Sequence, residues 1–161
     1  MSRMKLHKEK VGVRGFFRVQ LEKDGRIMGD TGWKENQVVN LGIQDYVVQW
    51  VTAGTGGKSV SHMVIGTGGA PASADTTLAG EVAGSKRAAV SSSIVSSRTA
   101  QFTAAFNSSD SFLTASANIS NVGLVNTSAT NTGTILCGAA FASSAIATNN
   151  NLNITYQVRF S

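Results

Sequence analysis

The stretch Leu152-Asn-Ile-Thr-Tyr-Gln-Val-Arg-Phe160 alternates apolar and polar side chains along its whole length. Such strict alternation predicts a β-strand with one face in a core and the other in solvent. The same rhythm recurs upstream, between residues that favour turns, in residues 13–21, 60–65, 90–95, 98–106, 113–119 and 135–141. The sequence therefore predicts a mainly β protein, an antiparallel β-sandwich of the jelly-roll type.

The first of these runs ends in a hairpin signal. Lys23-Asp-Gly-Arg26 follows the apolar positions Phe17, Val19 and Leu21. Asp-Gly accommodates positive φ angles, so it favours a tight turn between antiparallel strands. The return strand is expected to run through Ile27 and Met28 towards Trp33.

One segment has helical periodicity. We expect a helix over about residues 40–53, with Asn40 as its N-terminal cap and Gly54 just beyond its end. A helix here would place five apolar side chains on one face. They are Ile43, Tyr46, Val47, Trp50 and Val51.

Charge is distributed unevenly along the chain. Of the 14 Lys and Arg residues, nine fall between Arg3 and Lys34, whereas Asp110 and Arg159 are the only charged residues after Thr99. Enzymes concentrate titratable groups around a pocket, because acid–base and nucleophilic chemistry need them. The distribution favours an assembly protein and not an enzyme, and it gives no reason to expect a cofactor.

The sequence predicts a single β-sandwich domain, residues 13–161, preceded by a basic N-terminal arm, residues 1–12. Net charge of +5 attracts any negative partner, including an acidic protein surface. Direct nucleic-acid binding is less favoured, because the charges from Lys23 to Glu35 nearly cancel and the aromatic residues are not interleaved as a stacking platform. The third alternative is that the arm is a solvated terminus without a partner. The candidate interaction residues are Arg3, Lys5, Lys8, Lys10 and Arg14.

The remaining chemical candidates are weak. His7 and His62 are the only histidines, and no His, Cys, Asp or Glu cluster has the spacing of metal ligands. The segment Gly54-Thr-Gly-Gly-Lys-Ser59 lacks the spacing and the strand–helix setting of a phosphate-binding loop. Cys137 is the single cysteine and is expected to be a small buried residue.

No apolar run suggests a signal peptide or a membrane helix, so we expect a protein made and assembled in the cytoplasm without membrane association. Strands rich in Ala, Ser, Thr and Asn provide few bulky core residues. Contact with identical copies would compensate for this, which favours an obligate oligomer.

A series of motifs resembles virion structural proteins of tailed bacteriophages. The ordered set covers about residues 36–161. Its parts are Asn40-Leu-Gly-Ile43, His62-Met-Val-Ile-Gly-Thr-Gly68, Asp75-Thr-Thr-Leu78 with Glu81 and Arg87 beyond it, Ile119-Ser-Asn-Val-Gly-Leu-Val-Asn126, and the closing strand Leu152 to Phe160. The segment after Leu124 lacks an aromatic residue that often follows in that family.

This resemblance implies a non-enzymatic virion component. A short chain with a basic arm is more similar to a head decoration (cement) protein than to a fibre. The implied partners are the major capsid protein and the protein's own copies, as a homotrimer on the capsid surface. One alternative is a tail or neck component such as a collar, adaptor or short fibre protein; another is a carbohydrate-binding module using Trp33, Tyr46 and Trp50.

Overall fold

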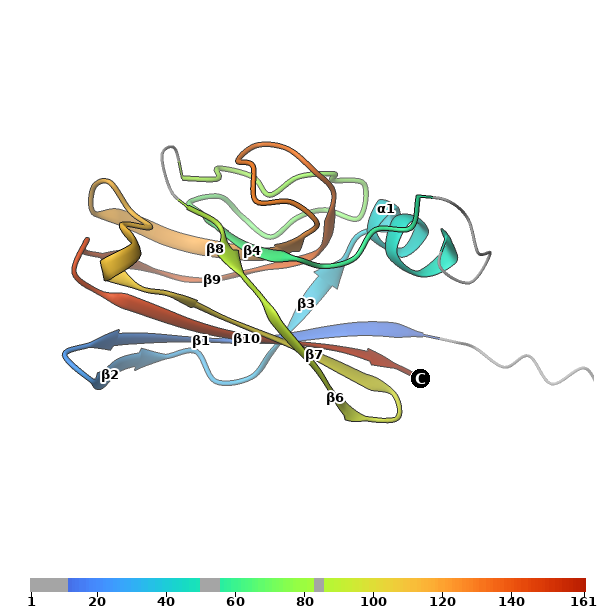
Figure 1. Ribbon diagram of the computed structural model, residues 1–161, viewed down its shortest axis with the longest axis horizontal. Helices are drawn as coiled ribbons and strands as arrows, with labels where there is room; N and C mark the ends of the chain where they lie inside the picture. The colour runs from blue at the N-terminus through green and yellow to red at the C-terminus, as the bar shows by residue number, and fades with distance from the viewer. Residues whose placement is uncertain (1–11, 50–55, 83–85) are drawn as a thin grey trace, which may run out of the picture.

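The computed structural model describes residues 12–49, 56–82 and 86–161 (Figure 1). It is mainly β, as predicted, and its ten strands form one antiparallel sheet in the order β5-β4-β8-β9-β3-β1-β10-β7-β6, with β2 pairing β1. The strands are β1 (Val13–Lys23), β2 (Arg26–Asp30), β3 (Lys34–Val38), β4 (His62–Gly66), β5 (Ala88–Ala89), β6 (Ser91–Ser96), β7 (Thr99–Phe106), β8 (Ala117–Val125), β9 (Ile135–Ile146) and β10 (Asn151–Phe160).

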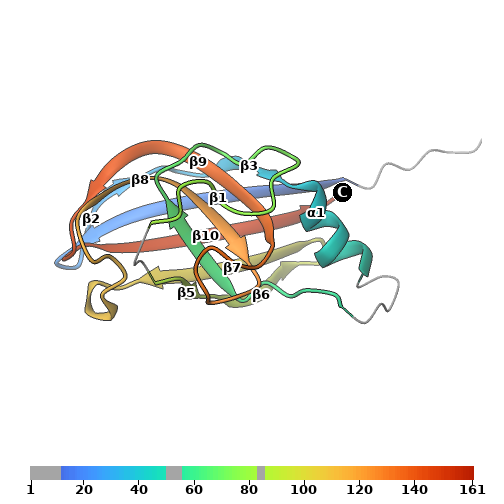
Figure 2. The ribbon, with the colours of Figure 1, turned by 90° about the horizontal axis from the view of Figure 1, so that it is seen from above.

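The sheet folds over itself into two layers, which makes a nearly closed barrel or sandwich (Figures 1 and 2). Sheet A contains β2, β1, β10, β7 and β6, and sheet B contains β9, β8, β4 and β5. Strand β3 joins the layers on one side, because it pairs with both β1 and β9. On the other side the chain passes from β5 to β6 through Val90 alone.

Strands β1 and β10 of sheet A confirm the alternation in the sequence, whereas β6, at the edge of this sheet, is exposed along its whole length and does not have the buried face that was expected. In β10, Ile154, Tyr156 and Val158 are buried while the residues between them are at least partly exposed. Tyr156 pairs with Phe17 of β1, and their rings stack with centroids 5.9 Å apart. The main core lies between this inner face and sheet B.

The predicted hairpin is present between β1 and β2. Asp24 and Gly25 both have positive φ, 50° and 73°, as a two-residue turn that matches strand twist requires. The return strand ends at Asp30, and β3 begins as a separate strand just after Trp33.

Sheet B departs from the expectation of one buried face. Met63, Val64 and Ile65 of β4 are buried in succession, and so are residues 135–139 of β9. The second face is covered by the loops of residues 67–82 and 126–134, which lie above sheet B in Figure 1. The strand expected from residue 113 begins only at Ala117.

The helix begins where predicted. It comprises α1 (Asn40–Ile43) and a π-helical turn, η1 (Gln44–Val48). Residues 50–53 of the predicted helix, with Trp50 and Val51, and Gly54 beyond its predicted end lie outside the described residues. The expected cap is wrong: Val39 occupies that position without a side-chain hydrogen bond.

Gly42 explains how close the helix lies to sheet B. A Cβ at this position would lie 2.3 Å from the carbonyl oxygen of Leu136 in β9. Glycine has a low helix propensity, but here the absence of a side chain allows the backbones of the helix and β9 to come into contact.

Candidate functional site

Of the five predicted interaction residues, the structure describes one. Arg3, Lys5, Lys8 and Lys10 lie outside the described residues. Arg14 is on β1, where its Nε donates to Glu35 Oε1 at 2.8 Å, and both side chains are more than half exposed. This hydrogen bond and the neighbouring charge lower the pKa of Glu35.

A second arginine lies directly beside Arg14. Arg159 of β10 is its partner in the strand register, and both guanidinium groups lie over the ring of Phe16. The distances from guanidinium carbon to ring centroid are 5.6 Å for Arg14 and 4.2 Å for Arg159. We call Arg14, Phe16 and Arg159 the basic corner; its charges are held by cation–π contacts as well as by Glu35.

The basic corner lies where residues 1–11 join the domain. Gly12 and Ser161 exchange backbone hydrogen bonds of 2.9 Å, so the described N-terminus and the C-terminus lie side by side. The sequence did not identify Arg159 as a candidate. The sequence feature that could have identified Arg159 is its position: it is the last cation in a nearly uncharged stretch, and it lies on the polar side of the closing strand.

The rest of the outer face of sheet A is polar and mostly self-paired. Arg18 donates to Asp30, and this hydrogen bond holds the pKa of Asp30 well below its usual range. Gln157 donates to Gln101 across β10 and β7. This face therefore offers hydrogen-bonding and charged groups for a polar contact.

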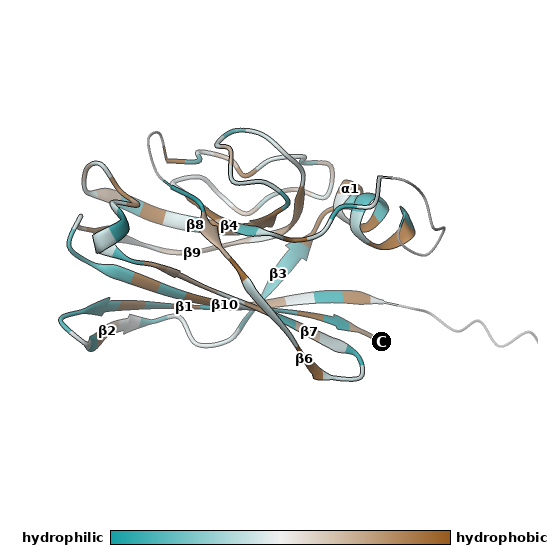
Figure 3. Ribbon diagram, in the orientation of Figure 1, coloured by the Kyte–Doolittle hydropathy of each residue, from teal (hydrophilic) through white to brown (hydrophobic). Residues whose placement is uncertain are grey.

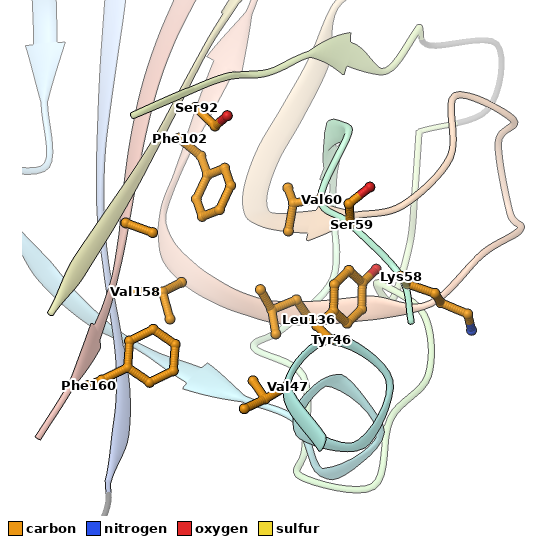
Figure 4. Close-up of a pocket in the computed structure, with 11 residues that line it drawn as sticks. Tyr46, Val47, Lys58, Ser59, Val60, Ser92, Phe102, Leu136, Val158 and Phe160 are labelled. Atoms are coloured by element: carbon orange, nitrogen blue, oxygen red, sulfur yellow. The ribbon is translucent and has the colours of Figure 1, made fainter. Parts of the chain in front are cut away.

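An apolar groove of about 270 Å³ opens between the inner face of sheet A and the helix (Figure 4). Tyr46, Val47 and Leu136 line one side, and Phe102, Val158 and Phe160 line the other. These six residues define the apolar groove. Its lining carries no pair of groups that would act as acid and base.

Lys58, at the edge of the apolar groove, has an internal structural role. Its Nζ forms an ion pair with Asp45 and donates to the hydroxyl of Thr134. Tyr46 donates to the backbone carbonyl of Thr134, so the helix, the segment before β4 and the loop before β9 meet here. Gly54 and Thr55, the first two residues of the segment that was compared with a phosphate-binding loop, lie outside the described residues.

Glu81 and Arg87, which belong to the motifs of the phage resemblance, form a buried ion pair. Both side chains are 3% exposed, and Arg87 Nε and Nη2 donate to the two Glu81 oxygens at 2.8 Å. Arg87 Nη1 also donates to the carbonyls of Thr127 and Thr132, and Glu81 accepts the backbone N–H of Asn131. Their role is to fix the two loops that cover sheet B.

Histidine and cysteine chemistry has no support in the described part of the chain. His62 is half-buried beside Ser61, and burial lowers its pKa. Cys137 is fully buried, and burial raises its pKa to about 12. Within residues 12–49, 56–82 and 86–161, no group of three His, Cys, Asp or Glu side chains is arranged to hold a metal ion.

Two of the three aromatic residues proposed for carbohydrate binding, Trp33 and Tyr46, do not share an exposed surface. Trp33 is exposed after β2, whereas Tyr46 is buried in the core, as its place on the predicted helix face indicated. Trp50 lies outside the described residues.

No family model matches the chain, and no curated protein or solved structure is significantly similar to it. Among the helices of the described residues, none has the length and apolar character needed to cross a membrane.

Proposed function

We propose that this protein is a non-enzymatic virion component of a tailed bacteriophage, a decoration (cement) protein that binds the outer capsid shell as an oligomer. The basic corner is the observation that carries the proposal. Arg14 and Arg159 are fixed on Phe16 at the point where four further cations, in residues 1–11, join the domain.

The partner would be an acidic surface of the major capsid protein. Exposed ion pairs contribute roughly 0–1 kcal/mol each, so the arm and the basic corner would orient the protein more than bind it. Repeated contact by several copies adds avidity, which is the physical reason for expecting an oligomer, with a homotrimer implied by the resemblance. Binding would stabilise the shell by joining neighbouring subunits.

The copy number in virions tests where the protein functions. Quantitative mass spectrometry of purified particles of the encoding phage should give an abundance comparable to that of the major shell protein. A few copies per particle would move the protein to the neck or tail, and its absence from particles would overturn the proposal.

The binding mechanism is tested with undecorated shells and three variants. Deletion of residues 1–11 and Arg159→Ala should each weaken binding at low salt and change it little at high salt, where exposed charges are screened. Lys86→Ala, which removes an exposed cation just before β5, is the matched control and should bind like the unmodified protein. Equal affinity of all forms at low salt would show that the basic corner does not contact the shell.

A further inference from the structure

The exposed large hydrophobic residues of the described chain gather on the edges of one sheet. Four of the six belong to sheet A: Ile27 and Met28 on β2, and Ile94 and Val95 on β6. Strand β2 pairs only with β1, and β6 pairs only with β7, so these are the two open edges of sheet A. Figure 3 shows the hydrophobic end of β6.

The β6 edge is continuous with the apolar groove. Ile94 is opposite Ala100 in the register, and Ala100 is opposite Val158, which lines the groove. Paired residues lie on the same face of a sheet, so Ile94 extends the apolar lining to the edge. It is nevertheless 84% exposed, because sheet B does not reach over it.

The β6 edge also lacks protection by charge. Its sequence, Ser91-Ser-Ser-Ile-Val-Ser96, contains neither a charged residue nor proline, the usual devices that keep an edge from pairing. A strand of this kind is compatible with an apolar partner, because nothing on it would have to lose a hydrated charge.

The β2 edge provides apolar side chains of suitable size. Ile27 and Met28 are 59% and 65% exposed on the hairpin after Asp24 and Gly25. The groove volume of about 270 Å³ accommodates such side chains, and methionine adapts to irregular spaces.

Charge does not oppose this contact. The four charged residues nearest the hairpin turn cancel: Glu22, Lys23, Asp24 and Arg26. The charged residue beside the groove, Lys58, forms an ion pair with Asp45. A basic segment would be less suitable there than this neutral hairpin.

We propose that the occupant of the apolar groove is a second copy of this chain, whose Ile27 and Met28 pack against Ile94 and the groove beside β6. The contact is head to tail, since the two surfaces differ, and such contacts close into rings when the rotation allows. Register shifts at Met28 and Val95 interrupt both edges, which limits unrestricted sheet growth. The inference deepens the oligomeric part of the proposed function and rests on it.

Self-association is measured on the purified full chain by sedimentation velocity, without shells, so that failure here leaves shell binding to be judged separately. The variants are Met28→Asp on the hairpin and Ile94→Asp on the groove edge. The unmodified protein should be oligomeric, and each variant alone should raise its apparent dissociation constant by about tenfold or more. Thr148→Asp, in the exposed turn between β9 and β10, is the control and should assemble normally.

Mixing the two variants distinguishes the arrangement. An equimolar mixture retains one intact hairpin and one intact groove, so it should form a one-to-one dimer that the double variant does not form. Association in the mixture also shows that both variants are folded. If circular dichroism shows that either aspartate variant is unfolded, Met28→Ser and Ile94→Ser replace the aspartate variants. If Met28→Asp assembled normally and Ile94→Asp did not assemble, the contact would be a two-fold contact between β6 strands, and the proposal would be wrong. A monomeric unmodified protein would also overturn the proposal.

Discussion

Sheets A and B have similar strands but bury them differently. In β10 of sheet A, buried and more exposed residues alternate from Leu152 to Val158. In β9 of sheet B, residues 135–139 are buried in succession. The difference arises because two loops cover the second face of sheet B, whereas the outer face of sheet A remains in solvent.

Each face of the molecule has an arginine–glutamate ion pair, and the two pairs differ in their exposure to solvent. Arg14–Glu35 on sheet A and Arg87–Glu81 over sheet B are both arginine–glutamate pairs at 2.8 Å. The first pair is 60% and 54% exposed, and the second is 3% exposed at both residues. Burial makes the second pair indispensable to its loops and leaves the first available for a partner.

Removal of the buried arginine should have the largest effect. In Arg87→Met, the Glu81 carboxylate, whose side chain is 3% exposed, loses its guanidinium partner, and the carbonyls of Thr127 and Thr132 lose their donor. Breaking a buried pair in this way costs about 3–5 kcal/mol of unfolding free energy. Urea denaturation followed by circular dichroism measures it.

The matched control is Arg14→Met. It removes an exposed pair of the same type and should leave the unfolding free energy almost unchanged, because solvent screens exposed charges. Equal effects of the two substitutions would contradict the distinction between the two sheets.

The sequence predicted sheet A better than sheet B for a physical reason. Alternation identifies a strand with one solvent-exposed face. Strands β1 and β10 meet that condition over most of their length, and β7 meets it from Ala104 to Phe106. The burial of β4 on both faces depends on loops whose position is decided by tertiary contacts. Glu81 and Arg87 are two of the four charged residues between positions 59 and 97, and they were the local sign of those contacts.

A glycine substitution at the contact between the helix and sheet B tests the comparison of the two sheets further, with a smaller expected change in stability. Gly42→Ala should destabilise the protein by about 1–3 kcal/mol, because the new Cβ would overlap the backbone of Leu136 in sheet B. Alanine normally stabilises a helix relative to glycine, so the expected sign is opposite to helix propensity.

Gly29→Ala on sheet A is the control for this substitution. A Cβ at Gly29 would meet Leu21 Cβ at 3.7 Å, which is ordinary contact. Its melting temperature should stay close to that of the unmodified protein. Stabilisation by Gly42→Ala would refute the close packing of helix and β9.

The candidate site was only partly predictable. The clustering of cations identified Arg14, but the contribution of Arg159 requires the pairing of the first and last strands, which lie 145 residues apart at these positions. The apolar groove likewise combines residues from the helix, β7, β9 and β10. No local pattern contains such distant neighbours.

Alkaline pH should produce the smallest effect, and it acts on the core and not on the outer face of sheet A. Burial raises the pKa of Cys137 to about 12, against about 8.5 for an unfolded cysteine. Above about pH 8.5 the unfolded chain loses this proton and the native protein keeps it. Stability is therefore unaffected by this group below that pH and falls as pH rises towards the native pKa, by at most about 1.4 kcal/mol per pH unit.

Cys137→Ala isolates this contribution. Urea denaturation between about pH 7 and pH 9, where most unfolded tyrosines are still protonated, should show a weaker decline for the variant than for the unmodified protein. Arg14→Met, which alters only the exposed face of sheet A, should leave the decline unchanged. If Cys137→Ala and the unmodified protein declined equally, the thiol would already be accessible in the native state, and a thiol reagent would then modify the folded protein.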